Sequence, residues 1–271
     1  MAISAKDVVA LRTRTGLGMM ECKKALAEAG GDMESAIALL REKLGKDMEE
    51  RSERAATEGR IGAASNGGSV AMVELKSETD FAAKTESFID AANKIAELAL
   101  ACDDGDITPS DEMNKLVEDL RISIKENISF GRGIKMSGDK VGAYVHHNGK
   151  VGAIITGSGD LDDALIAGLC QHVTAAVPPL MPAPKAVDQD GLAQEEIEKA
   201  TAEFVEEAKA SGKPEEICEK IAQGKLRKWV GDNTLMGQPY VRDMEGKKPI
   251  RDHVPSGATV SSFLRYELGD V

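Results

Sequence analysis

Residues that could support metal or redox chemistry are few and widely spaced in this chain. The four cysteines are Cys22, Cys102, Cys170 and Cys218. They form no C-x-x-C pair, so the sequence predicts neither a zinc knuckle nor a redox motif. Each lies at an apolar or semi-apolar position of a helical pattern, where a reduced, buried thiol is the usual occupant. His146-His147 falls at an expected hairpin tip with no patterned carboxylate nearby, which argues against a metal site.

Motifs for phosphate binding and nucleophilic catalysis are also missing from the sequence. There is no G-x-x-x-x-G-K-[ST], no dinucleotide fingerprint, no G-x-S-x-G and no H-E-x-x-H. The turn 157–160 resembles a phosphate loop only faintly, because two glycines in a turn are common. His172 lies within an expected helix, where a satisfied or exposed histidine is more usual than a catalytic one. No catalytic machinery and no cofactor site is therefore predicted.

The stretch Thr79-Asp80-Phe81-Ala82 is the feature that needs a separate explanation. It places an aromatic side chain at a polar junction between a strand-like run, 69–76, and a long amphipathic helix, in a chain that is only 3% aromatic. One interpretation is a hydrophobic staple, in which Phe81 covers the first helical turn near Phe88. The other is a wedge that inserts into a partner. The local pattern favours the staple, since an aromatic at helical spacing usually belongs to the core.

Composition limits the classes of partner and the compartment. The net charge of −12 argues against a general nucleic-acid binder, which needs clustered Lys and Arg to neutralise phosphates. The N-terminus carries charges within its first seven residues and has no apolar run of seven residues, so neither a signal peptide nor an anchor is expected. No stretch approaches the length of a membrane span. We expect a cytoplasmic protein that meets other proteins, without direct nucleic-acid or membrane contact.

The N-terminal residues, 1–45, are predicted to form three short helices. Ser4 and Gly30-Gly31 supply capping signals. The expected buried face of the second helix is Met19, Cys22, Ala25, Leu26 and Ala29. Met20 lies off that face, beside two lysines, and would be an exposed contact residue. The charged segment 46–58 is interpreted as a solvated helix or linker and as a domain boundary.

The central residues predict an α+β core in two related halves. Asn66-Gly67-Gly68 and Asn148-Gly149 each join two strand-like runs, which is a hairpin signal. An amphipathic helix follows each hairpin. We therefore expect a core N-subdomain over 59–138 and a core C-subdomain over 139–228, each a small antiparallel sheet packed with helices.

The C-terminal third predicts a helical arm and a further module. Two charged helices over about 190–228 share a thin apolar seam and are expected to project from the body as an interaction arm. That seam consists of Ile197, Phe204, Val205, Ile217 and Ile221. Residues 229–271 form the last module, which is irregular over 229–252. Its segment 258–268 alternates in its second part and is expected to return as a strand to one of the sheets.

Several motifs resemble those of translation elongation factor Ts. The run Leu11–Leu26 matches the opening of that family, and Thr79-Asp80-Phe81-Ala82 matches its Thr-Asp-Phe-Val signature. Further matches, in the family's order, are Glu126-Asn127-Ile128, His172-Val173, Ser211–Pro214 and Gln238–Val241. The resemblance implies a guanine-nucleotide exchange factor for the GTPase elongation factor Tu, without covalent chemistry. It also implies an N-terminal domain like a ubiquitin-associated fold, a two-part core with a helical arm, and a C-terminal module.

The resemblance also implies which residues contact the GTPase. The signature Thr79–Ala82 would displace Mg²⁺ from the GTPase, with Phe81 inserted between two of its helices. The other implied contacts are Arg12, Met19, Met20, Lys23, Ile124, His172 and Val241.

Three positions depart from the family pattern. Ala82 replaces the usual Val, Lys125 stands where Gly is often seen, and Arg242 stands where an apolar residue is common.

Two other functions are weighed against exchange activity. The chain could be a binding scaffold whose N-terminal bundle recruits a helical or ubiquitin-like partner. It could also be an enzyme with a cleft between the core halves, but no clustered His, Cys, Asp and Glu pattern supports that.

Overall fold

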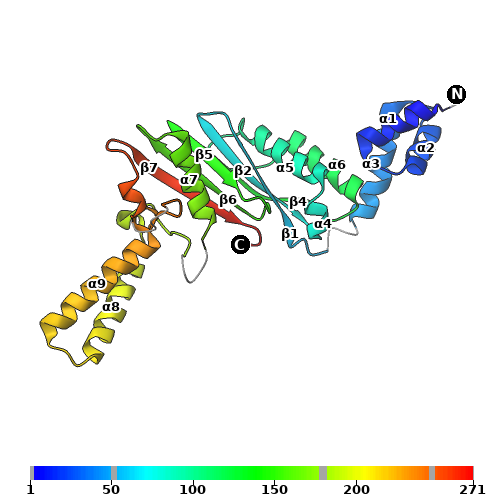
Figure 1. Ribbon diagram of the computed structural model, residues 1–271. Coiled ribbons are helices and arrows are strands. Elements are labelled where there is room, and N and C mark those ends of the chain that lie inside the picture. Colours follow the sequence, from blue (N-terminus) through cyan, green and yellow to red (C-terminus); the bar gives the residue numbers. More distant parts are fainter. Residues whose placement is uncertain (1–2, 50–53, 177–181, 244–247, 271) are drawn as a thin grey trace.

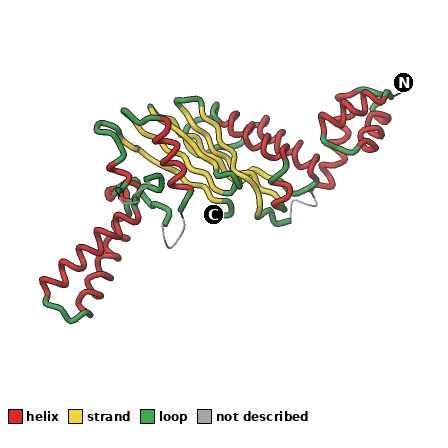
Figure 2. The backbone as a smooth tube through the Cα atoms, viewed as in Figure 1, coloured by secondary structure: helices red, strands yellow, loops and turns green. Residues whose placement is uncertain are grey.

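The computed structural model describes residues 3–49, 54–176, 182–243 and 248–270. The described chain is elongated (Figure 1), with helices at one end, a two-sheet core in the middle and a helical arm at the other end. Figure 2 shows that the strands gather in the middle and that helices flank them. Small antiparallel sheets packed with helices confirm the predicted α+β class.

Three helices form the N-terminal unit, as predicted. They are α1 (Ala5–Thr15), α2 (Met19–Glu28) and α3 (Met33–Glu49). Ser4 caps α1 by accepting from the amide of Asp7, and Gly16 ends it in the left-handed conformation, with φ of 70°. The expectation for Met19 is wrong, because its side chain is 40% exposed. It is the first residue of α2. α3 continues into the segment expected as a solvated helix or linker; the domain boundaries themselves stay a prediction.

The first sheet has four strands in the order β1-β2-β4-β3, all antiparallel. The strands are β1 (Glu58–Ser65), β2 (Ser69–Ser77), β3 (Gly105–Asp106) and β4 (Ser129–Ser137). Helices α5 (Glu86–Ala99) and α6 (Asp111–Ile124) cover one face. Alternate residues of β2 separate the two faces: Ala71, Val73 and Leu75 pack under the helices, whereas Val70 and Met72 point to the other sheet.

The second sheet has three strands in the order β5-β6-β7. These are β5 (Lys140–Val145), β6 (Val151–Ser158) and β7 (Thr259–Glu267), and helix α7 (Asp163–Thr174) covers the outer face. The predicted returning strand is confirmed as β7, which pairs with β6. The inner faces of the two sheets meet around Ile61, Met72, Ile154 and Tyr266.

The two halves share a device for close helix packing. A Cβ atom at Gly62 of β1 would lie 2.4 Å from the carbonyl oxygen of Ala92 in α5. A Cβ atom at Gly142 of β5 would lie 2.4 Å from a methyl carbon of Ile166 in α7. In each half, the first strand of the hairpin therefore needs glycine where its helix crosses.

The predicted long amphipathic helix is confirmed as α5, and a separate turn of helix precedes it. The single turn α4 (Asp80–Ala83) comes first, and α5 starts afresh at Glu86. Thr79 caps α4 and Thr85 caps α5 through their hydroxyl groups. Because the chain is interrupted between these caps, Phe81 does not lie over the first turn of α5.

The arm consists of α8 (Gln194–Ala210) and α9 (Glu215–Asn233) and leaves the core as predicted (Figure 1). Small residues form much of its seam, with Ala208, Cys218 and Ala222 buried, while Ile217 is 45% exposed, contrary to expectation. α9 also runs five residues beyond the predicted end of the arm. Three short 3₁₀ turns occur at Gln189–Gly191, Leu235–Gly237 and Ile250–Asp252. Cys102 is only half-buried, unlike the other three cysteines.

Candidate protein-interaction surface

Phe81 is the most exposed large apolar side chain of the described chain, at 79%. It is the second residue of α4, whose neighbouring residues Ala82 and Ala83 are buried. The staple interpretation is therefore wrong: Phe88 is fully buried in the core of the first half, and Phe81 faces solvent. The exposed ring leaves apolar surface in contact with water, and covering that surface by a partner would be favourable.

A short hydrogen-bond network holds the base of α4. The amide of Thr79 donates to Oε2 of Glu126 at 3.0 Å, and its hydroxyl donates to Oε1 of the same carboxylate at 2.6 Å. The same hydroxyl accepts from the amide of Ala82 at 3.2 Å. Next to it, Oε1 of Glu78 accepts from the amide of Asn127 at 2.6 Å. The exposed ring thus stands on a turn that is fixed to the segment after α6.

Asp80 lies beside Phe81 and is paired within its own turn. Its carboxylate is 2.5 Å from Nζ of Lys84, and the hydrogen bond from Lys84 lowers the pKa of Asp80, with a smaller contribution from the charge of Lys150. Lys150 itself forms an ion pair with Glu58 at 2.8 Å. Asp80 is therefore a carboxylate at neutral pH that a stronger cationic partner could draw away from Lys84.

Ile124 ends α6 and is half-buried, packed against the core of the first half. The following residue, Lys125, has φ of 64° and caps the helix in the left-handed conformation. Its Nζ lies 2.9 Å from Oε1 of Glu21 in α2. Since Glu126 comes next, one short segment contacts both the base of α4 and the N-terminal unit.

The N-terminal unit carries four of the predicted contact residues, and all four are exposed to solvent. Met20 is 65% exposed and Met19 is 40% exposed, while Arg12 and Lys23 are also exposed. Glu21, which binds Lys125, follows the two methionines directly. The segment from Ile124 to Glu126 therefore contacts both the start of α2, where the two methionines lie, and the base of α4, which carries Phe81. The sequence alone did not predict these connections.

His172 differs from the other predicted contact residues because its side chain is fully buried. Its Nδ1 accepts from the amide of Val241 at 3.2 Å, so Nε2 carries the hydrogen and donates to Oε1 of Gln238 at 2.8 Å. Gln238 in turn donates to the carbonyls of Pro182 and Asp232. Burial lowers the pKa of His172, although the Gln238 hydrogen bond opposes this effect.

The imidazole therefore does not reach the surface in this structure, while Val241, held by it, is 47% exposed. The expected direct contact of His172 is not supported by its burial. Its position instead makes it a support for Val241.

Sequence reasoning gave no role to the residues that hold these contacts in place. Glu126 lies 47 residues from Thr79, and Gln238 lies 66 residues from His172. Both belong to stretches that match the family pattern, which was the one available signal. Their partners follow from the tertiary fold and not from any local spacing.

Among the residues that the structure describes, no group of three or more His, Cys, Asp or Glu side chains could hold a metal ion. Within those same residues, no helix has both the length and the apolar character needed to cross a membrane.

Comparison with known proteins identifies the family. The family model described as elongation factor TS matches residues 78–270. Elongation factor Ts of Alkalilimnicola ehrlichii is 39% identical over 100% of this chain and 93% of its own length. Elongation factor Ts of Idiomarina loihiensis is 37% identical over 100% of this chain and 92% of its own. That of Pasteurella multocida is 38% identical over 99% of this chain and 92% of its own. With a family model across most of the chain and relatives aligned along all of it, this protein belongs to the elongation factor Ts family of translation elongation factors.

Proposed function

We propose that this protein is a cytoplasmic guanine-nucleotide exchange factor for elongation factor Tu. It would bind the GDP-bound GTPase, displace Mg²⁺ and release GDP so that GTP can enter, without forming or breaking a covalent bond. The observation that supports this proposal best is the exposed Phe81 ring on a fixed turn. Family membership supplies the expected partner.

Exchange requires the factor to bind the nucleotide-free GTPase more tightly than the nucleotide-bound one. The coupling is reciprocal, so nucleotide weakens the binding of the factor by the same ratio. A rigid ring that enters between two helices of the GTPase would move the elements that hold Mg²⁺ and phosphate. Loss of Mg²⁺ removes much of the charge stabilisation of the bound diphosphate.

The fixed base of α4 suits this role, because the turn that carries Phe81 must keep its position when the ring enters the GTPase. Both carboxylate oxygens of Glu126 accept hydrogen bonds from Thr79, so the turn that carries Phe81 is anchored to the segment after α6. Asp80, next to the ring, would exchange its pairing with Lys84 for a cation or amide of the GTPase.

The remaining exposed contacts would supply affinity at other points of the GTPase. Met19 and Met20 offer adaptable apolar side chains beside Arg12 and Lys23 on the N-terminal unit. At the far end of the core, Val241 would contact the GTPase while buried His172 keeps its loop in place.

The experiment is release of labelled GDP from elongation factor Tu, with and without this protein. An aromatic anchor is worth about 2 kcal/mol or more of binding, or about 30-fold in affinity. Phe81→Ala should therefore slow catalysed GDP release by at least that order, with an unchanged circular dichroism spectrum. Ile217→Ala is the matched control, since it removes an exposed apolar side chain from the arm, away from α4.

Wild-type release rates in Phe81→Ala would contradict the wedge. Binding of the GTPase without any faster release by the wild-type protein would contradict exchange activity and favour a scaffold.

A further inference from the structure

The N-terminal unit is attached to the core along one helix, α6. Each of its three helices contributes a contact: Gly16 at the end of α1, Glu21 on α2 and Arg41 on α3. They meet Asp119 and Ser123 in the second half of α6 and Lys125 directly after it. The attachment is therefore a specific interface and not only a covalent connection.

Ile122 is the apolar centre of this interface. It is 4% exposed and packs with Leu17, Leu40 and the rest of the N-terminal core, although it belongs to α6. Other residues of the same helix, such as Val117 and Leu120, pack in the core of the first half. α6 thus contributes side chains to two hydrophobic cores at once.

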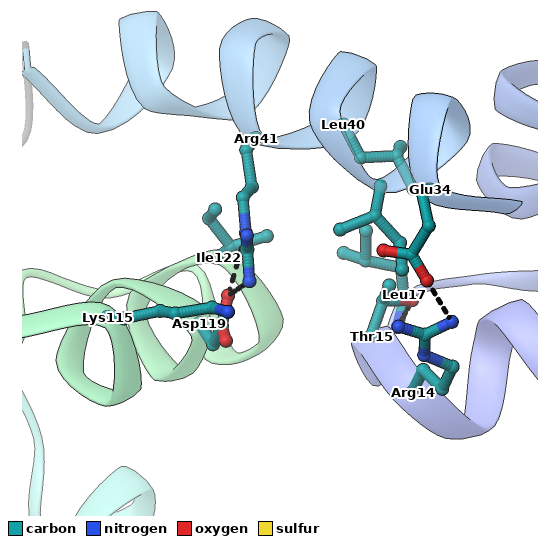
Figure 3. A pocket seen from close by; sticks show the side chains of 10 residues that line it. Arg14, Thr15, Leu17, Glu34, Leu40, Arg41, Lys115, Asp119 and Ile122 are labelled. Carbon is teal, nitrogen blue, oxygen red and sulfur yellow. Dashed lines mark hydrogen bonds and ion pairs between the residues drawn. The ribbon is translucent and has the colours of Figure 1, made fainter. Parts of the chain in front are cut away.

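Polar contacts lie on both sides of Ile122. Arg41 donates through Nε and Nη2 to Oδ1 of Asp119, at 3.0 and 2.6 Å, as Figure 3 shows. On the other side, Lys125 contacts Glu21 at 2.9 Å. Between them, a Cβ atom at Gly16 would lie 3.0 Å from that of Ser123, so the chain approaches closely there.

The interface is not filled completely. A cavity of about 200 Å³ lies at one side of the interface, between the N-terminal unit and α6 and beside the Arg41–Asp119 pair (Figure 3). An apolar pivot next to a cavity leaves room for the unit to rotate. Contacts on both sides of the pivot are what restrict such rotation.

Lys125 is unusual for its conformation. Among the residues that the structure describes, it is the one non-glycine residue with a positive φ, at 64°. A side chain is disfavoured there, and glycine would adopt this conformation freely. The ion pair with Glu21 is about 40% exposed on both sides, and pairs of such exposure add little stability. Stability alone therefore does not explain a lysine at this position.

Glu21 is well placed to transmit the restraint. Its Oε2 accepts from the amide of Gly18 at the start of α2, while Oε1 binds Lys125. The hydrogen bond from Lys125 lowers the pKa of Glu21, so the carboxylate is charged at neutral pH. The pair thus joins the beginning of α2, where Met19 and Met20 lie, to the segment that holds α4.

We propose that Lys125 and Glu21 are positioning residues that fix the angle of the N-terminal unit relative to Phe81. This inference rests on the proposed exchange function. With the angle fixed, the methionines and Phe81 can engage one GTPase together, because the second contact then forms at a high effective concentration. Without the pair, the N-terminal unit would rotate about Ile122. The methionines and Phe81 would then bind the GTPase less cooperatively.

The test uses two variants that break the pair in different ways. Lys125→Gly removes the cation and also relieves the unfavourable φ, whereas Glu21→Gln removes the charge but keeps an acceptor for Gly18. Lys125→Arg should retain the pair. Lys94→Gln is the matched control, because it breaks an exposed 2.9 Å pair with Glu97 on α5, away from the interface.

Two measurements are needed on the full chain. Residual dipolar couplings should show reduced alignment of α1–α3 relative to the core in Lys125→Gly and Glu21→Gln, but not in the other two variants. In GDP release from elongation factor Tu, KM should rise about 3- to 10-fold with kcat unchanged, as expected for lost binding common to ground and transition states. The melting temperature of Lys125→Gly should equal or exceed that of the wild type, which excludes simple unfolding.

Wild-type couplings in both pair-breaking variants would overturn the positioning role. Altered couplings with an unchanged KM would overturn its link to binding. If the wild-type protein fails to accelerate GDP release, the proposed exchange function falls, while the couplings still decide whether the pair fixes the angle.

Discussion

The hydroxyl of Thr79 donates to Oε1 of Glu126 at 2.6 Å and accepts from the amide of Ala82 at 3.2 Å. One side chain therefore caps α4 and fastens it to the segment after α6. This relationship makes the position of Phe81 depend on a contact between residues 47 apart in the sequence.

We expect Thr79→Val to weaken the base of α4. The substitution keeps the side-chain volume but removes both hydroxyl hydrogen bonds, and a bond to a charged group is worth about 1.5–3 kcal/mol. Amide hydrogen exchange at Ala82 should become faster, and catalysed GDP release should fall, though less than in Phe81→Ala. Thr79→Ser retains the hydroxyl and serves as the control. Unchanged protection of the Ala82 amide in Thr79→Val would show that the bonds do not support the turn.

The features that were predicted well are those encoded locally. Asn66-Gly67-Gly68 and Asn148-Gly149 specify hairpins through turn chemistry, and the alternation of Leu264 and Tyr266 specifies β7. The break between α4 and α5 had a local signal too, since Thr79 and Thr85 are both suited to be N-caps. The apolar spacing of Phe81 and Phe88 concealed it.

The features that were missed depend on tertiary contacts. Local periodicity cannot tell whether His172 faces solvent or a neighbouring loop, and the structure buries it against Gln238. Nor could it show that Lys125 would find Glu21 across 104 residues. The candidate surface was therefore predicted as separate residues, while the network that joins them required the fold.

Arg132 is expected to be essential for joining the two sheets. It pairs with Glu74, which is fully buried, at 2.9 Å, stacks over the ring of Tyr266 at 4.2 Å and donates to the carbonyl of Glu267. Arg132→Leu removes the closer cation from the buried Glu74 carboxylate and leaves Lys76 at 3.9 Å. Loss of one partner of a buried pair costs at most about 3–5 kcal/mol. Urea unfolding should show the loss as a lower midpoint.

Comparison with the double variant Glu74→Met/Arg132→Leu separates the two causes. It removes the buried charge as well, so it should recover much of the lost stability. A double variant no more stable than Arg132→Leu would mean that lost packing, and not the lost cation beside the buried carboxylate, causes the effect.

The free energy of unfolding should fall in mild acid because of His172. Burial lowers the pKa of its folded-state imidazole below the ordinary value of 6.5. The unfolded chain therefore takes up a proton before the folded chain does. The contribution of this histidine is fully present above about pH 6.5 and is lost as the pH falls from there through the folded-state pKa. Protonation of Nδ1 would also oppose the donor amide of Val241.

The measurement is the melting temperature between pH 7.5 and 5.0 for three proteins. His172→Gln cannot titrate in this range, so its melting temperature should fall less steeply than that of the wild type. His147→Gln, at an exposed position, should follow the wild type. If the melting temperatures of the wild type and His172→Gln fall equally steeply with pH, His172 is not the source of the pH dependence.

Gly62→Ala should disturb the packing of α5 and thereby the position of α4, the turn that carries Phe81. The new methyl group would lie 2.4 Å from the carbonyl oxygen of Ala92, a backbone atom that cannot rotate away. Overpacking of this kind costs about 1–3 kcal/mol. Gly68→Ala is the matched control, since no atom lies within 4 Å of its Cβ position and φ is not positive. Because α4 ends just before α5, a displaced α5 should reduce GDP release together with the melting temperature. A stable Gly62→Ala protein with slow exchange would show instead that the position of α5 matters to the partner directly.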